Sequence, residues 1–84
     1  MFNKKTILIT GGSGSWRQEL TKQLLMKYSP KEIRIYSRGE PKQVSMNRYF
    51  KNNKRLKFII GDVRDVERLE QATQGVDYLF HLAA

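Results

Sequence analysis

Short apolar runs alternate with longer stretches of mixed polarity along the chain. Three of the runs cover residues 6–10, 32–36 and 56–60, and a fourth covers residues 76–82. Apolar runs of this length, bounded by glycine, proline or charged residues, are typical of buried strands. The pattern therefore predicts four strands.

The stretches between the runs have helical spacing. A first helix is predicted over residues 19–28, ended by Ser29-Pro30. Its apolar face, expected to pack on the sheet, consists of Trp16, Leu20, Leu24, Leu25 and Tyr28. A second helix is predicted from Glu40-Pro41, where proline in the first turn costs no hydrogen bond, to Asn52-Asn53. Its expected buried side consists of Val44, Tyr49 and Phe50.

A third helix is predicted between Asp65, a candidate N-cap, and Gly75, a candidate C-terminal stop. Its inner face is expected to carry Val66, Leu69 and Thr73. The resulting order βαβαβαβ predicts an α/β fold, a Rossmann-like three-layer arrangement whose parallel sheet has strand order 3-2-1-4 and helices on both faces. Ligands of such sheets bind beyond the carboxyl ends of the strands, next to strand one.

Length and composition limit the remaining classes. With 84 residues, the chain is expected to form a single domain over residues 1–84. It has no cysteine and one histidine, so no metal site is expected. The apolar runs are too short for a bilayer span or a secretory signal, which predicts a cytoplasmic protein. The net charge of +8 raises nucleic acid or another anionic ligand as a partner.

The glycine-rich segment after the first strand carries the strongest functional signal. Gly11 suits a tight turn, and Gly14 lets the backbone approach a ligand closely. Backbone N–H groups at the start of the following helix favour an anion such as a pyrophosphate. Gly-Lys-Ser/Thr is absent, so the segment is not a P-loop. The candidate cofactor-binding residues of this loop are Gly11, Ser13, Gly14, Ser15 and Trp16.

Arg17 departs from the dinucleotide-binding pattern. Dinucleotide folds place a third glycine at this position, so that the helix can pack closely on the strand. A long cationic side chain there leaves three alternatives: it swings outward, the helix shifts, or the site is impaired. One rival hypothesis is therefore a Rossmann-like chain that binds no cofactor.

The ends of the other strands supply further candidates. Ser37, Arg38 and Lys42 follow strand two, where a basic residue accepts the 2′-phosphate of NADP and an acidic one binds the 2′-hydroxyl of NAD. This favours NADP, with NAD as the alternative; a surface pair of Arg38 with Glu40 is the competing interpretation.

The last two strands complete the predicted site. After strand three, Asp62 is a candidate acceptor for the adenine amino group, or a turn residue, and Val63 a contact for the ring. Leu82, Ala83 and Ala84 end strand four and suit close approach by a ribose or nicotinamide. His81 is expected to be a packed residue beneath the site.

These motifs resemble the extended short-chain dehydrogenase/reductase family, and more narrowly the N-terminal part of UDP-N-acetylglucosamine 4,6-dehydratases, which are polysaccharide biosynthesis proteins. The resemblance rests on Ile7-Leu8-Ile9-Thr10-Gly11-Gly12-Ser13-Gly14-Ser15-Trp16, Ile35-Tyr36-Ser37-Arg38, Phe58-Ile59-Ile60-Gly61-Asp62-Val63-Arg64-Asp65 and Gly75-Val76-Asp77-Tyr78-Leu79-Phe80-His81-Leu82-Ala83-Ala84. It implies an NAD(P)-dependent lyase acting on a nucleotide sugar, with the cofactor residues named above. A related epimerase or reductase is an alternative.

The catalytic Tyr-x-x-x-Lys pair of that family does not occur among these 84 residues. We therefore assign no catalytic residue, and expect a truncated dinucleotide-binding domain without the substrate-binding part, inactive alone. Strand four would then form an open edge, which predicts self-association. A basic nucleic-acid-binding module is the rival from another class, although Tyr49 and Phe50 have the spacing of a buried helix face. No membrane partner is expected.

Overall fold

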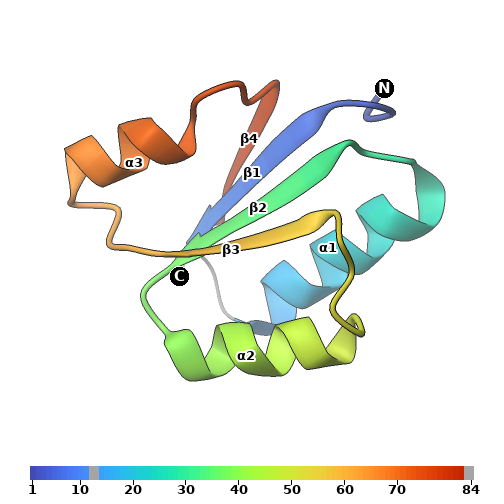
Figure 1. Cartoon of the computed structure of the whole chain (residues 1–84), viewed down its shortest axis with the longest axis horizontal. Coiled ribbons are helices and arrows are strands. Elements are labelled where there is room, and N and C mark those ends of the chain that lie inside the picture. Colours follow the sequence, from blue (N-terminus) through green and yellow to red (C-terminus); the bar gives the residue numbers. More distant parts are fainter. Residues whose placement is uncertain (12–13, 83–84) are drawn as a thin grey trace.

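A computed structural model describes residues 1–11 and 14–82 of the chain. The strands are β1 (Thr6–Gly11), β2 (Glu32–Ser37), β3 (Leu56–Ile60) and β4 (Tyr78–Leu82). The helices are α1 (Gly14–Lys27), α2 (Glu40–Tyr49) and α3 (Val66–Ala72). The strands form one parallel sheet of order β3-β2-β1-β4, with α1 and α2 on one face and α3 on the other (Figure 1). The predicted α/β class, strand order and helix layers are confirmed.

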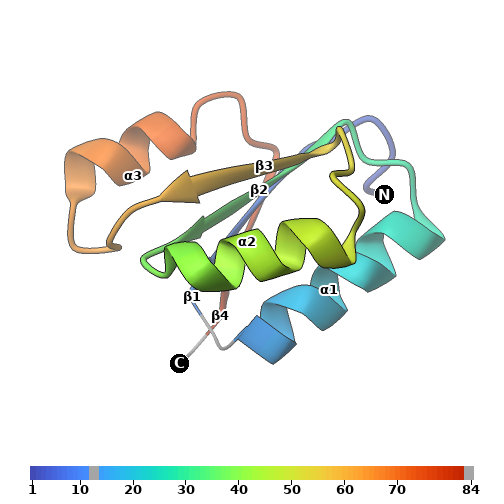
Figure 2. The same ribbon diagram turned by 60° about the horizontal axis from the view of Figure 1, so that its bottom comes forward.

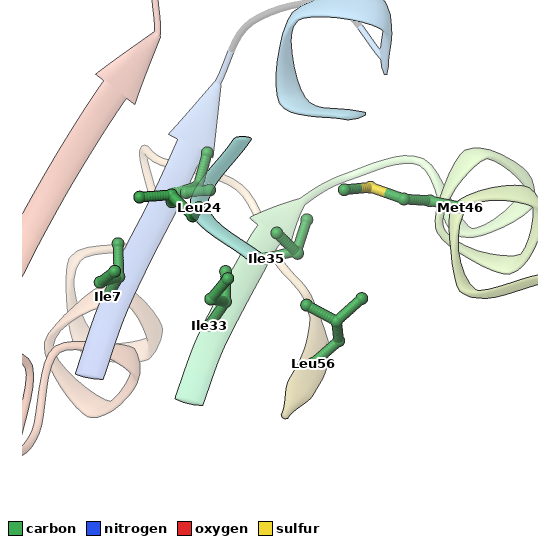
Figure 3. Packing of buried hydrophobic residues seen from close by; sticks show 7 residues of the cluster. Ile7, Leu24, Ile33, Ile35, Met46 and Leu56 are labelled. Atoms are coloured by element: carbon green, nitrogen blue, oxygen red, sulfur yellow. The ribbon is translucent and has the colours of Figure 1, made fainter. Parts of the chain in front are cut away.

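The two central strands are the most deeply buried part of the molecule. Ile7 and Ile9 of β1 and Ile33 and Ile35 of β2 have no exposed surface, because α1 and α2 cover the face to which they point. Leu24, Met46 and Leu56 complete this larger core (Figure 3). The turned view in Figure 2 shows α1 and α2 lying along this one face of the sheet. Burial on both faces explains the continuous apolar run Ile7-Leu8-Ile9 in β1, whereas β2 alternates its buried isoleucines with the partly buried Glu32 and Arg34.

The opposite face is covered by the short helix α3. Here Leu8 and Tyr36 pack with Ala72 in a smaller core. Arg34 of β2 lies on this face; its Nη1 donates to the carbonyl oxygens of Ala72, at 2.9 Å, and Gln74, at 2.6 Å. These carbonyls lie at the end of α3, where no intrahelical donor is left for them. The sheet therefore supplies the C-terminal cap that holds α3 in place.

The N-terminus of α1 differs from the sequence prediction. The helix begins at Gly14, five residues before the predicted start at residue 19, and ends near Ser29-Pro30 as expected. Apart from Trp16, the residues before Leu20 in this helix include no large apolar side chain, so the helical spacing becomes regular only from Leu20 onward. Trp16 does not pack on the sheet as predicted, since it is 68% exposed.

The expected inner faces of α2 and α3 were partly wrong. In α2 the buried residues are Gln43 and Met46, whereas Val44 and Tyr49 are exposed. In α3 Asp65 is the N-cap as predicted, because its side chain accepts from Arg68 N, but Val66 is exposed. In a short helix with few apolar residues, the sequence pattern does not fix the rotation of the helix about its own axis. The fit of individual side chains against the sheet decides which side is buried.

The last strand begins later than predicted, at Tyr78 instead of residue 76. Gly75 adopts a positive φ of 76°, as expected of a residue that ends a helix, and Val76 N then donates to Thr73 O. Asp77 joins the turn to the sheet: its N donates to Thr6 O at 2.8 Å, and its Oδ2 accepts from Thr6 N at 2.9 Å. The turn therefore extends into the expected strand.

Replacing Met46 and Val44 by alanine separates the observed rotation of α2 from the predicted one. Met46 is 4% exposed and Val44 is 43% exposed. We expect Met46→Ala to lower the free energy of unfolding by about 2–5 kcal/mol through the cavity it leaves. Val44→Ala should change it by less than about 1 kcal/mol. Urea unfolding measures both, and equal losses would contradict the observed rotation.

Candidate functional site

The carboxyl ends of all four strands surround one open cavity of about 840 Å³. Its walls come from segments far apart in the sequence, which the parallel topology brings to the same edge of the sheet. They consist of Gly11, Arg17, Tyr36, Ser37, Arg38, Gly39, Pro41, Lys42, Gly61, Val63, Arg64, His81 and Leu82. The cavity lies where open parallel sheets bind their ligands, beside the central strand at which the chain reverses its direction of winding.

Gly11 ends β1 and is paired with Leu82 of β4. Its φ is +72°, and a Cβ atom at this position would collide with the carbonyl oxygen of Leu82. Only glycine combines this backbone conformation with this approach without strain. Gly11 thus has the left-handed backbone conformation that the predicted tight turn requires.

The wall formed by β2 and α2 depends on a buried glutamine. Gln43 Nε2 donates to Ser37 Oγ at 2.9 Å and to Ile59 O at 2.9 Å, which ties the ends of β2 and β3 to α2. Ser37 is thus fixed on the cavity wall with its hydroxyl oxygen accepting one hydrogen bond. Arg38 is 75% exposed at its side chain and extends from the same wall, beside Lys42.

A carboxylate lies between two arginines at the edge of the cavity. Asp62 Oδ2 is 2.8 Å from Arg64 Nη2 and 3.7 Å from Arg38 Nη1, and Oδ1 accepts a hydrogen bond from Arg64 N. The hydrogen bonds from Arg64 lower the pKa of Asp62 from 3.8 to about 2. Asp62 therefore does form the turn that the sequence suggested. Arg38 pairs with Asp62, and not with Glu40 as the competing interpretation had it.

The backbone of this loop is held from below by Tyr36. The fully buried Tyr36 hydroxyl donates to Asp62 O at 2.8 Å. A Cβ on Gly61 would collide with the same phenol, so the loop approaches the ring as closely as a glycine allows. The rigid sheet thereby sets the backbone position of Asp62 and Val63, of which Val63 lines the cavity.

The Arg17 side chain is buried and does not point outward. Arg17 is 5% exposed, and its Nη1 donates to Gly11 O at 2.9 Å. Burial lowers the pKa of this guanidinium. The first alternative raised by the sequence, an outward side chain, is wrong.

Six of the thirteen predicted site residues line one cavity, and Asp62 pairs with two of the arginines on its wall. Those that line the cavity are Gly11, Ser37, Arg38, Lys42, Val63 and Leu82. Gly14 and Ser15 line a neighbouring cavity of about 590 Å³ between α1 and α2, which Lys42 also lines. Trp16 lines neither cavity, and its exposure separates it from the group. Ser13, Ala83 and Ala84 lie outside the described residues.

His81 is not packed beneath the site as expected. It is exposed on the cavity wall, where its Nδ1 is 2.7 Å from Thr10 Oγ1. Sequence reasoning also missed the positions of Gln43 and Arg64. A signal existed for Arg64, because it follows Asp62 by two residues, the spacing of a turn whose backbone N–H binds an aspartate. Nothing in the sequence marked Gln43, which lies on a helix of mostly polar residues.

The sequence of this chain is similar to those of known proteins. The model of a family described as "Polysaccharide biosynthesis protein" matches residues 7–84. The chain belongs to this family. It is 54% identical over 84 residues to a UDP-N-acetylglucosamine 4,6-dehydratase (inverting) of Campylobacter jejuni, and 48% identical over 87 residues to a UDP-glucose 4-epimerase of Rickettsia felis. All of the chain is aligned in both cases, and it spans 25% of the length of each relative.

Solved structures agree with this placement. The protein Pen from Bacillus thuringiensis is 33% identical and superposes with a TM-score of 0.91 over 100% of the chain and 26% of its own. A short-chain dehydrogenase/reductase of Veillonella parvula, solved in complex with NADP, is 26% identical with a TM-score of 0.73, over 92% of the chain and 34% of its own. The chain is thus homologous to the N-terminal part of nucleotide-sugar dehydratases, as the motifs suggested. These relatives give no support to a nucleic-acid-binding module.

Residues 1–11 and 14–82 contain neither a metal-binding cluster nor a membrane-spanning helix. No three histidine, cysteine, aspartate or glutamate side chains of this part lie close enough together to hold a metal ion. Nor does any helix there have the length and apolar character needed to cross a membrane.

Removing the side chains of its arginine partners should move the pKa of Asp62 back toward its ordinary value, while the hydrogen bond from the backbone N–H of residue 64 remains. Because the folded-state pKa of about 2 lies below 3.8, the Asp62 interactions stabilise the fold above pH 3.8 and are lost as the pH falls toward 2. We expect Arg64→Ala to raise this pKa toward 3.8, and Arg38→Ala to raise it less. An NMR titration of the Asp62 carboxyl carbon measures it; an unchanged midpoint in Arg64→Ala would contradict the assignment.

Proposed function

We propose that this chain is the NADP-binding portion of a nucleotide-sugar 4,6-dehydratase of the UDP-N-acetylglucosamine class. The observation that carries the proposal is the cavity at the carboxyl ends of the four strands, with a glycine turn on one side and cations on the other. Membership of the polysaccharide biosynthesis family and the similarity to a dehydratase support the substrate class.

The residues of the cavity fit a dinucleotide. At Gly11 the backbone leaves no room for a side chain, which is the close approach that a pyrophosphate needs. The walls carry Arg38, Lys42 and Arg64, whose guanidinium and ammonium groups suit phosphate oxygens. The half-exposed Val63 offers an apolar surface for an aromatic base.

Each part of the cofactor has candidate partners. Gly11, Gly14 and Ser15, with Ser13 of the same loop, would hold the pyrophosphate, and Leu82, Ala83 and Ala84 would lie along the nicotinamide ribose. Ser37, Arg38 and Lys42 would bind the 2′-phosphate that distinguishes NADP from NAD. Asp62 would accept the adenine amino group while Arg64 holds its carboxylate in place. When bound, the nicotinamide would supply hydride transfer to and from the sugar.

The activity of the whole protein is a separate part of the proposal. The similarity to a UDP-glucose 4-epimerase favours epimerisation as the second candidate. The family's Tyr-x-x-x-Lys pair is absent from these 84 residues. A base for the sugar hydroxyl is therefore not provided here, and we infer that the chain alone binds the cofactor but does not turn over a sugar substrate.

Cofactor preference tests the cation assignment. We expect the chain to bind NADPH more tightly than NADH, and Arg38→Ala to reduce this ratio by about tenfold or more, because a charge-assisted contact to the 2′-phosphate is lost. Lys42→Ala should act in the same direction. Nicotinamide fluorescence titrations measure each affinity.

Arg48→Ala is the matched control for these titrations. Arg48 also lies on α2 and is exposed, but it lines neither cavity. Removal of the Arg48 side chain changes the net charge by the same amount as the other two substitutions. It should leave the ratio of NADPH affinity to NADH affinity unchanged. A ratio that falls equally in all three variants would indicate a general charge effect instead of a 2′-phosphate contact.

We also infer that the chain self-associates through the outer edge of β4. Among the described residues β4 pairs only with β1, and it exposes Leu79. Unpaired strand edges recruit other strands, and charges on them prevent this. Sedimentation velocity should show dimers or larger species, reduced in Leu79→Lys. A compact monomer at high concentration would contradict the inference.

A further inference from the structure

Arg17 is a buried charged side chain that the proposed function does not use. It lies in the first turns of α1 and is 5% exposed, at the position where dinucleotide folds place a glycine. Helical side chains lean toward the N-terminus of their helix. The Arg17 side chain accordingly reaches back toward the end of β1, where its Nη1 donates to Gly11 O at 2.9 Å.

This location places the guanidinium between two cavities. Arg17 lines both the cavity at the strand ends and the one between α1 and α2. Lys42 lines the same two cavities from the α2 side. The contacted residue, Gly11, is the one whose bare backbone a pyrophosphate would approach. The Arg17 side chain therefore borders the cavity at the end where a pyrophosphate would meet Gly11.

A cation in this place could bind a phosphate as a clamp, or it could block the space that a phosphate would enter. Its burial distinguishes these two roles. A phosphate clamp must present its donors to the ligand, as the exposed Arg38 does with a side chain that is 75% exposed. Arg17, at 5%, presents almost no surface. The start of a helix is also unfavourable for a positive charge, so packing and the bond to Gly11 O keep Arg17 there. This burial does not suit a phosphate clamp.

We propose that Arg17 occludes the pyrophosphate end of its own cofactor site. A dinucleotide binds only after the guanidinium releases the carbonyl oxygen of Gly11 and leaves the cavity wall. The adenosine end, formed by Ser37, Arg38 and Val63, is open throughout. This inference rests on the proposed function, and it specifies how access to that site is limited.

The test compares a complete dinucleotide with a ligand that lacks the pyrophosphate. NADPH and adenosine 2′-monophosphate are titrated by calorimetry into the 84-residue chain and into Arg17→Gly and Arg17→Met. Arg17→Gly should bind NADPH about tenfold more tightly or better, since no charged hydrogen bond has to be broken. Affinity for adenosine 2′-monophosphate should stay within about twofold in every chain, a difference of less than about half a kcal/mol.

Arg17→Met keeps an unbranched side chain of similar length and so protects the test against a folding defect in the glycine variant. Its gain for NADPH should be smaller than that of Arg17→Gly, because bulk remains while the hydrogen bond is lost. Circular dichroism checks the fold of each variant.

The outcomes separate the inference from the proposed function. The occlusion is overturned if both folded variants bind NADPH no more tightly than the unchanged chain does. It is also overturned if the affinities for NADPH and for adenosine 2′-monophosphate rise equally. In either case, binding of NADPH still supports the proposed cofactor site. If no chain binds either ligand, the proposed function fails and the occlusion with it.

Discussion

The burial of β1 and β2 on both faces is the constraint from which the rest of the structure follows. Strands without exposed side chains need helices above and below the sheet, and parallel strands need those helices as connections. The same topology brings every strand-to-helix loop to one edge. Ile9 and Ile35, deep in the core, thus fix where Gly11, Arg38 and their neighbours lie. The cavity is a consequence of core packing, not of contacts between the site residues themselves.

A second layer of contacts aligns the loops on this frame. Gln43 joins Ser37 to the end of β3, and the Tyr36 hydroxyl holds the backbone of Asp62. Both are uncharged and buried, so their hydrogen bonds persist over the pH range in which surface ion pairs weaken. The exposed charges then act from fixed starting points: Arg64 and Arg38 meet one carboxylate and still extend into the solvent. The site accordingly combines a rigid wall with an adaptable, positively charged edge.

The sequence was sufficient for the strands and their order, because four apolar runs separated by helical stretches allow few other topologies. Helix rotation was less predictable. Val44 and Met46 are both apolar, and only the shape of the sheet surface decides that Met46 is buried. Positions near strand ends, such as Arg38 and Val63, were assigned to the correct edge. Gln43 could not be found, since its importance lies in three hydrogen bonds to residues brought near by folding.

Arg17 shows how a fold and its site respond differently to one residue. An arginine in place of a close-packing glycine would be expected to push the helix away from the sheet. Yet the arrangement matches a solved relative with a TM-score of 0.91, and the side chain is buried instead of expelled. The space for it must therefore come from the loosely filled region between α1, α2 and the strand ends, where both cavities lie. The core is left intact, and the consequence of Arg17 falls on the space that a ligand would enter.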